Sequence, residues 1–346
     1  MQCPNCQANI PDDDVFCEVC GQRLSNASCP HRAGEDGFCE LCGLRVVPPP
    51  EDHEEIVLSP DFAGVTDRGV RRTRNEDRFA LRQAGGADIL VVCDGVSTSH
   101  DSQLASAAAA AAAADSLAQT LDGAPDSDHE KILQSALAAA ARSVAGLGPD
   151  GPEGNPEDNP PSTTIVAAIV QNGSAAVGWA GDSRAYWVSH GAAKQLTIDH
   201  SWLSEVVAKG EMPLAEAEKS PTAHAITRWL GADAPAADSY SVVCTPLGEP
   251  GVLLLCTDGL WNYVSDGEHM AALVLQLQNG TGDMLKLTRG LIEFAKKKGG
   301  SDNITAAALR VHKPEPATEA PEPDTQPATQ AEEEETVHPV ESPDAQ

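Results

Sequence analysis

The stretch Ile89-Leu90-Val91-Val92-Cys93-Asp94-Gly95 places an aspartate and a glycine directly after five apolar residues. The same arrangement recurs where the run Ala175–Ala180 leads to Asp182, and where the run Val252–Cys256 leads to Asp258. A short apolar run that ends in turn residues is typical of a buried strand. We therefore expect three strands to deliver their carboxylates to one shared rim.

Two further acidic motifs complete an ordered set of five. The motifs are Arg74-Asn75-Glu76-Asp77, Cys93-Asp94-Gly95, Gly181-Asp182-Ser183-Arg184, Thr257-Asp258-Gly259-Leu260-Trp261 and Ser301-Asp302-Asn303. Hard divalent cations such as Mg²⁺ and Mn²⁺ prefer oxygen ligands, and a pair of them can clamp a phosphate group. Any one motif alone is ordinary turn chemistry. The ordered set favours a dinuclear metal site over five unrelated turns.

With these motifs the chain resembles the metal-dependent serine/threonine protein phosphatases of type 2C, the PPM family, in its bacterial form. The resemblance extends from about Asp61 to Val311. Besides the acidic motifs it is carried by Thr66–Arg72, Ser162-Thr163-Thr164, Ala180–Tyr186, Leu196-Thr197, Asp199-His200-Ser201, Thr227-Arg228 and Leu230-Gly231.

The resemblance implies an α+β fold, a four-layer α-β-β-α sandwich of two antiparallel sheets flanked by helices. Sequence pattern alone predicts only mixed α and β structure. Strand-like runs cover 89–93, 164–170, 175–180, 252–256 and 304–311, and helical stretches are expected at 102–121, 131–147, 202–209, 269–278 and 282–298. The alanine-rich stretch 102–121 suits close packing on a sheet, because alanine is small and the best helix former.

The resemblance also implies the chemistry: hydrolysis of phosphoserine or phosphothreonine in a protein, by in-line attack of a hydroxide bridging two Mn²⁺ or Mg²⁺ ions. Asp94 would bridge both ions, the Gly95 carbonyl would bind one of them, and Asp258 and Asp302 would hold the other. The remaining metal-site residues would be Glu76 and Asp77, which support the shell partly through waters, Asp182 at a third and weaker ion, and Asn303, which orients Asp302.

Arg72 corresponds to the arginine that grips the substrate phosphate, a task that suits a guanidinium fork. The alternative for Arg72 is one surface arginine among several, since Arg68, Arg71 and Arg74 lie beside it. The alternative for Asp182 is a turn cap formed with Arg184.

The chain departs from the family pattern after Asp94-Gly95. Val96 stands where some members carry a histidine proposed as general acid, and His100 has a different spacing, so that role is not transferred. We expect His200 to be structural. No nucleophilic thiol is needed, so we interpret Cys93 and Cys256 as small apolar residues at the ends of buried strands.

Seven of the ten cysteines precede residue 43. Paired Cys-x-x-Cys motifs in a cytosolic chain indicate zinc rather than disulfides. We expect a tandem zinc ribbon with two structural Zn²⁺ ions. The first would be held by Cys3, Cys6, Cys17 and Cys20, and the second by Cys29, His31, Cys39 and Cys42. The alternative for His31 is an ordinary surface residue.

Composition limits the partners. The formal net charge of −29 argues against nucleic acid and anionic membranes, and the N-terminus lacks the basic and apolar regions of a signal peptide. We expect a cytoplasmic protein that acts on phosphorylated proteins and opposes a serine/threonine kinase. Rival hypotheses are a weak or inactive phosphatase-fold adaptor that docks partners through its zinc ribbon, and a phosphatase of small phosphate esters.

The predicted organisation has four parts. The zinc ribbons occupy 1–45, a proline-rich and acidic linker 46–60, and the phosphatase domain 61–312. The tail at 313–346 has seven prolines, ten acidic residues and one lysine, too few apolar residues to form a core.

Overall fold

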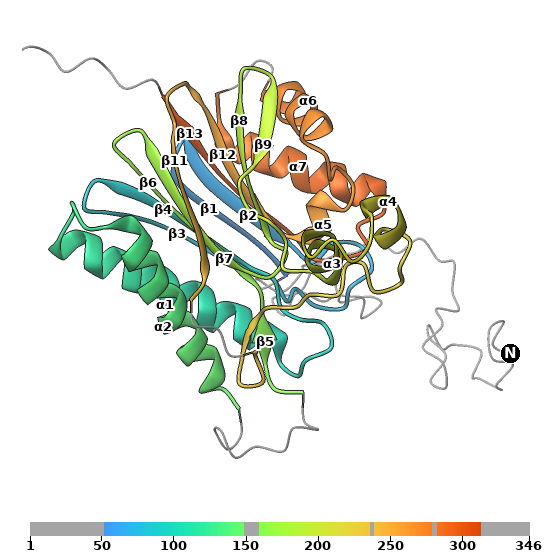
Figure 1. Ribbon diagram of the computed structural model, residues 1–346. Helices are drawn as coiled ribbons and strands as arrows, with labels where there is room; N and C mark the ends of the chain where they lie inside the picture. Colours follow the sequence, from blue (N-terminus) through green and yellow to red (C-terminus); the bar gives the residue numbers. More distant parts are fainter. Residues whose placement is uncertain (1–51, 149–158, 236–238, 279–281, 313–346) are drawn as a thin grey trace, which may run out of the picture. The chain divides into compact units, whose positions relative to one another are not determined.

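Two antiparallel sheets pack against each other, and helices cover the outer face of each (Figure 1). The computed structural model describes residues 52–148, 159–235, 239–278 and 282–312. The first sheet has the order β1 (His53–Ser59), β2 (Phe62–Asp67), β13 (Ile304–Val311), β12 (Gly251–Cys256), β8 (Arg184–Ser189) and β9 (Ala192–Gln195). The second has the order β11 (Ser241–Pro246), β7 (Ser174–Ala180), β6 (Ile165–Gln171), β4 (Ala87–Cys93) and β3 (Arg78–Ala84).

The buried apolar residues form three clusters, and each cluster lies between two neighbouring layers of the fold: one between the two sheets, and one between each sheet and its helices. Along β4, Ile89, Val91 and Cys93 face the outer helices, whereas Leu90 and Val92 face the opposite sheet. Because side chains alternate along a strand, one continuous apolar run fills the core on both sides of its sheet. The predicted α-β-β-α sandwich is therefore confirmed.

The helices lie where their apolar faces meet a sheet. α1 (Ser102–Gly123) and α2 (His129–Ala145) cover the second sheet, and α6 (Gly267–Gln278) and α7 (Met284–Lys298) cover the first. Ala105, Ala109 and Ala113 of α1 are fully buried. The small alanine side chains therefore form the face of α1 that packs on the sheet, as the sequence predicted. Three short helices, α3 (Trp202–Ala208), α4 (Leu214–Ala217) and α5 (Asp258–Trp261), and the strand pair β5 (Ser162–Thr163) and β10 (Leu230–Gly231) complete the described structure.

The predicted linker was wrong over its second half. β1 occupies residues 53–59 and pairs with β2 along its whole length. The domain therefore includes β1, which precedes the expected start at residue 61. β1 is an edge strand with exposed charged residues such as Glu54. Charged residues at a sheet edge prevent pairing with other chains, and here they also remove the apolar pattern by which a strand is predicted from sequence. Within the described residues, no helix is both long and apolar enough to cross a membrane.

Candidate metal and phosphate site

Four aspartates from four strand ends line one cavity of about 170 Å³. Asp94 follows β4 and Asp182 follows β7, both in the second sheet, whereas Asp258 follows β12 and Asp302 precedes β13 in the first. The cavity therefore lies where the two sheets of the sandwich meet, and Gly95 also lines it. The predicted shared rim is present.

Asp77 lies fully buried beside this rim. Its Oδ2 accepts hydrogen bonds from Thr257 Oγ1 at 2.9 Å and from Thr305 Oγ1 at 2.8 Å. Its Oδ1 is also buried but has no hydrogen-bond partner among the described residues. A buried carboxylate oxygen without a partner is costly, and a cation or a cation-bound water is a suitable partner for it.

Burial and neighbouring charges raise the pKa values of Asp77 and of three carboxyl groups of the rim. Burial, reinforced by the charges of Asp258 and Asp302, raises the pKa of Asp77 to about 7. Burial and Asp258 raise the pKa of Asp182 to about 7. Burial and Asp302 raise the pKa of Asp258 to about 6, and burial with the neighbouring carboxylates raises the pKa of Asp94 well above its ordinary value. Such a set of hard oxygen donors fits divalent cations such as Mg²⁺ or Mn²⁺.

In the observed arrangement the carboxylates are paired with protein groups. Arg72 Nη2 donates to Asp302 Oδ2 at 2.6 Å, whereas burial and the charges of Asp77 and Asp258 raise the pKa of Asp94. Like charges this close need either a shared proton or a counter-charge. Across the ranges that the structure describes, no three acidic, histidine or cysteine side chains already form a group that could hold a metal.

Arg72 therefore reaches the predicted rim, although it contacts Asp302 there. Its pKa is raised above the ordinary value, mainly by the hydrogen bond to Asp302. Glu76 is buried at the base of the same loop, and its Oε1 accepts from Arg74 Nε at 3.0 Å. The Glu76 carboxylate thus does not line the cavity.

Asn303 holds the loop that carries Arg72. Its Nδ2 donates to the carbonyls of Arg68 and Arg74, each at 2.9 Å, and its Oδ1 accepts from the Glu76 backbone N–H at 2.8 Å. Only its backbone N–H contacts Asp302, at Oδ1 and 2.8 Å. Asn303 thus contacts Asp302 through its backbone N–H, whereas its side chain fixes the loop.

Asp182 does not form the turn cap with Arg184 that was the alternative for it. The Arg184 guanidinium makes a fork to Asp199, with Nη2 donating to Oδ2 at 2.6 Å, and lies over the Trp261 ring. Asp182 itself is buried, and its carbonyl accepts from Trp261 Nε1 at 2.9 Å. Its carboxylate is thus free to face the cavity that it lines.

His200 has the structural role that was expected. Its Nδ1 accepts from the Gly181 backbone N–H at 3.1 Å, and its Nε2 lies 2.9 Å from Ser241 Oγ. The ring stacks on Trp179, and burial lowers its pKa to about 4. A neutral ring fixed in this way positions the turn that carries Asp182. Cys93 and Cys256 are fully buried free thiols, as predicted.

Sequence reasoning missed part of the cavity wall. His224 and Ile226 enter it from the segment between α4 and β10, and Val96 and Ser97 enter it after Gly95. His224 is exposed at the rim and tilts against Trp261. An imidazole at this position can donate a hydrogen bond to a phosphate oxygen. No spacing signal points to His224, because the loop that brings it here has no periodic pattern.

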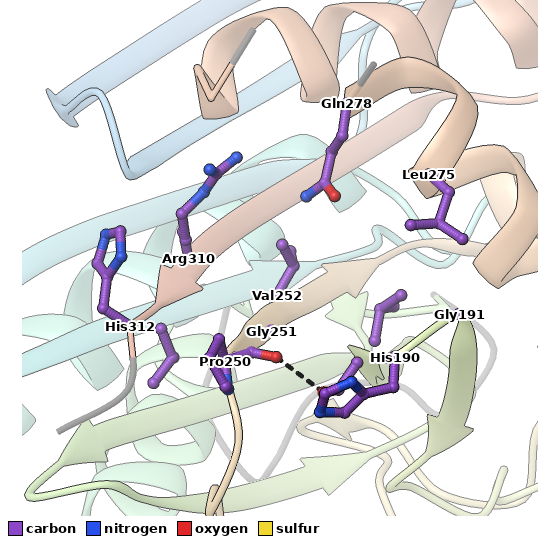
Figure 2. A pocket seen from close by; sticks show the side chains of 12 residues that line it. His190, Gly191, Pro250, Gly251, Val252, Leu275, Gln278, Arg310 and His312 are labelled. Carbon is purple, nitrogen blue, oxygen red and sulfur yellow. Dashed lines mark hydrogen bonds between the residues drawn. The ribbon is translucent and has the colours of Figure 1, made fainter. Parts of the chain in front are cut away.

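A second cavity, of about 270 Å³, lies at the opposite strand ends (Figure 2). It is lined by the end of β8, the start of β12 and the end of β13, including His190, Arg310 and His312. Ser189 Oγ donates to the Pro250 carbonyl at its edge, at 2.7 Å. The rim aspartates lie at the opposite ends of these strands, so this cavity is not part of the candidate site.

The predicted zinc ligands, Cys3, Cys6, Cys17, Cys20, Cys29, His31, Cys39 and Cys42, lie outside the described residues. A family model described as a zinc-ribbon domain matches residues 2–24, which include the first set of four cysteines. The second set remains a prediction.

Comparisons with known proteins agree with the geometry of the rim. A family model described as protein phosphatase 2C matches residues 67–287. A serine/threonine phosphatase, stp, of Listeria welshimeri is 29% identical over 248 residues, which cover 69% of this chain and 91% of that protein.

Solved structures give the same result. The serine/threonine phosphatase Stp1 of Staphylococcus aureus superposes with a TM-score of 0.62 at 25% identity, covering 75% of this chain and 98% of that one. The catalytic domain of the phosphatase PstP, in complex with two manganese ions, superposes with a TM-score of 0.55 at 26% identity, covering 72% and 97%.

Proposed function

The chain belongs to the protein phosphatase 2C family, and from this premise we propose that it is a metal-dependent phosphatase of phosphoserine and phosphothreonine in proteins. The related Listeria protein is a serine/threonine phosphatase. The cavity at the aspartate rim is lined by oxygen donors, as a metal-assisted hydrolysis requires.

One observation carries the proposal: the acidic cluster of the buried Asp77 and Asp182 and the half-buried Asp94 and Asp258, whose pKa values are all raised. So many carboxyls withdrawn from water are destabilising when ionised, unless a cation neutralises them. The Asp77 Oδ1 atom, buried without a partner among the described residues, supports the same conclusion. A solely structural role leaves this cost without compensation.

We assign the roles as follows. Asp94, the Gly95 carbonyl, Asp258 and Asp302 would hold two Mn²⁺ or Mg²⁺ ions, with Asp77 and Glu76 behind them and Asp182 at a third. When bound, such ions lower the pKa of a water and neutralise phosphate charge. Arg72 would exchange its hydrogen bond to Asp302 for the substrate phosphate, which a guanidinium can bind through two parallel donors.

The cellular setting follows from this chemistry. A phosphatase of this kind would oppose a serine/threonine kinase and act on that kinase's products. Two Zn²⁺ ions in the cysteine-rich segment, the second held by Cys29, His31, Cys39 and Cys42, would be structural, because four-ligand sites of this type are closed.

The test is hydrolysis of a phosphothreonine peptide by the full chain, with and without Mn²⁺. We expect turnover that needs the metal and falls at least about a hundredfold in Asp258→Asn, because a neutral amide is a much poorer metal ligand. The matched control is Asp126→Asn, which makes the same change at an exposed turn between α1 and α2. The proposal would be contradicted if Asp258→Asn and Asp126→Asn reduced turnover equally. It would also be contradicted if a metal chelator left the turnover of the wild-type protein unchanged.

A further inference from the structure

A second pocket opens directly beside the aspartate rim. It has a volume of about 390 Å³, and it shares Val96 and Ile226 as lining residues with the cavity that contains Asp94 and Asp258. A peptide segment whose phosphate lies at the rim can therefore place a neighbouring side chain in this pocket, since successive residues of an extended chain are only about 3.3–3.8 Å apart.

Backbone hydrogen bonds fix the walls of this pocket, which we call the flanking pocket. The Val96 backbone N–H donates to the Ser162 carbonyl at 2.9 Å, and the Val96 carbonyl accepts from the Ser99 N–H at 2.8 Å. Ile226 forms a β-bridge with Ser201. The pocket thus has its shape before a substrate arrives, which lowers the entropic cost of binding.

Trp229 is the largest side chain that lines the flanking pocket. Its Nε1 donates to Asp233 Oδ1 at 3.0 Å, and the same oxygen accepts from Ser162 Oγ at 3.2 Å. Because the indole N–H is satisfied, the ring presents an apolar surface to the pocket. Among the described residues that line this pocket, none carries a positive charge that would select an acidic side chain.

Charge excludes one class of flanking residue. The pocket is lined by Asp233, whose carboxylate lies outside the proposed metal site. A glutamate or aspartate side chain that entered the pocket would be repelled by this carboxylate. An apolar side chain instead gains from leaving water, in proportion to its buried area.

We propose that this pocket binds a large apolar side chain next to the phosphoserine or phosphothreonine of the substrate, so that the enzyme prefers phosphosites with an apolar flank over those with an acidic or small polar one. The inference rests on the proposed function, because it concerns the same reaction at the same rim.

The test compares three phosphothreonine peptides that differ only in the two residues flanking the phosphothreonine, which are leucine, serine or glutamate. Full-length protein with Mn²⁺ is used, and kcat/KM is measured for each peptide. We expect the leucine peptide to exceed the serine peptide by at least about tenfold, the size of effect an apolar pocket gives. The glutamate peptide should be the poorest.

Variants at Trp229 connect that preference to this pocket. Trp229→Ala should reduce the leucine-to-serine ratio to about twofold or less, whereas Trp229→Phe should keep most of it, because phenylalanine retains an aromatic wall. The ratio does not depend on the folded fraction of a preparation. Thr98→Trp, which fills the same pocket from an exposed position, should lower the ratio as well.

Two failures are distinguishable. If wild-type protein hydrolyses all three peptides with equal kcat/KM, or prefers glutamate, the flanking-pocket inference is wrong and the proposed function stands. If it hydrolyses p-nitrophenyl phosphate with Mn²⁺ but none of the peptides, or neither substrate, the proposed protein phosphatase function fails and the inference fails with it.

Discussion

At the scale of single residues, the rim is a set of acids that need a counter-charge. Asp302 has one in Arg72, at 2.6 Å, whereas burial and the charges of Asp77 and Asp258 raise the pKa of Asp94. Asp77 has two hydroxyl donors on one oxygen and, within the described residues, no partner on the other. A divalent cation would supply the counter-charge that this group of carboxylates needs.

Removing the Arg72 guanidinium tests its assignment. We expect Arg72→Ala to raise KM for a phosphothreonine peptide about tenfold or more, because a charge-assisted bidentate bond to phosphate is lost. Arg72→Lys should recover only part of this, since an ammonium lacks the planar fork. The control is Arg71→Ala, which removes an exposed arginine from the preceding position. Equal increases in KM for the Arg72→Ala and Arg71→Ala proteins would show that only the general positive charge of the loop matters.

Sequence reasoning predicted which aspartates reach the rim but not which groups they contact there. Asp94 and Asp258 were predictable because each follows a continuous apolar strand. The contact between Arg72 and Asp302, separated by 230 positions, was not, because it depends on the charge balance of a folded site. The contacts of the Asn303 side chain were not predictable for a similar reason: its amide satisfies backbone groups of a loop that no spacing rule identifies.

At the scale of elements, strands with a continuous apolar sequence were predicted, whereas strands of mixed sequence were not, whether central, as β2 and β8 are, or at a sheet edge. β4 and β12 are apolar throughout most of their length and were found nearly at their observed bounds. β1, β9 and β11 lie at sheet edges and are half-exposed, so their sequences mix polar and apolar residues. β1 was consequently assigned to a linker. The fold was predicted correctly because the family resemblance supplied the topology that the pattern lacked.

The short helix α5 depends on close backbone contact with the loop before β13. A Cβ atom on Gly259 would lie 1.9 Å from the Asn303 carbonyl oxygen, and backbone cannot move aside as a flexible side chain can. We expect Gly259→Ala to cost about 1–3 kcal/mol of unfolding free energy and to lower metal affinity, because it separates Asp258 from Asp302. Chemical denaturation and Mg²⁺ titration by calorimetry measure the two effects.

The matched control for that substitution is Gly123→Ala at the end of α1, where an added Cβ meets nothing within 4 Å. That change should be neutral or stabilising by up to about 1 kcal/mol. A Gly259→Ala protein with unchanged stability and metal affinity would show that α5 and the loop before β13 move independently.

At the scale of the whole molecule, the negative net charge of the chain determines which ions and substrates are attracted to the rim. The chain carries a formal net charge of −29, and the rim adds a local concentration of carboxylates. Such a field attracts divalent cations and repels phosphate esters. Bound cations would therefore serve binding of the substrate as well as its hydrolysis, because the single guanidinium of Arg72 at Asp302 does not balance the four aspartates that line the cavity.

The pH dependence of metal stabilisation follows from the raised pKa values. Asp77 and Asp182 have pKa values of about 7 and Asp258 of about 6 in the fold, against about 4 in an unfolded chain. A raised folded pKa contributes stability that is complete below the unfolded pKa and is lost as pH rises through the folded pKa. The metal-free protein is therefore penalised at this site above about pH 6–7, where the carboxylates ionise without a counter-ion.

We expect Mg²⁺ to remove that penalty, and to do so only where the ligands are ionised. At about pH 8, Mg²⁺ at a hundredfold excess over its dissociation constant should stabilise the fold by about 2.7 kcal/mol, which corresponds to a rise in Tm of roughly 5–10 °C. At about pH 5.5 protons compete for the same oxygens, and the rise should nearly vanish. His200 is neutral in the fold, with a pKa of about 4, so it lowers the stability of the fold as the pH falls. This effect is the same with and without Mg²⁺ and therefore cancels in the difference between the two Tm values.

Thermal unfolding with and without Mg²⁺ at the two pH values measures the rise in Tm, and Asp258→Asn should reduce this rise at the higher pH. An equal rise at both pH values would mean that Mg²⁺ binds elsewhere than at these carboxylates.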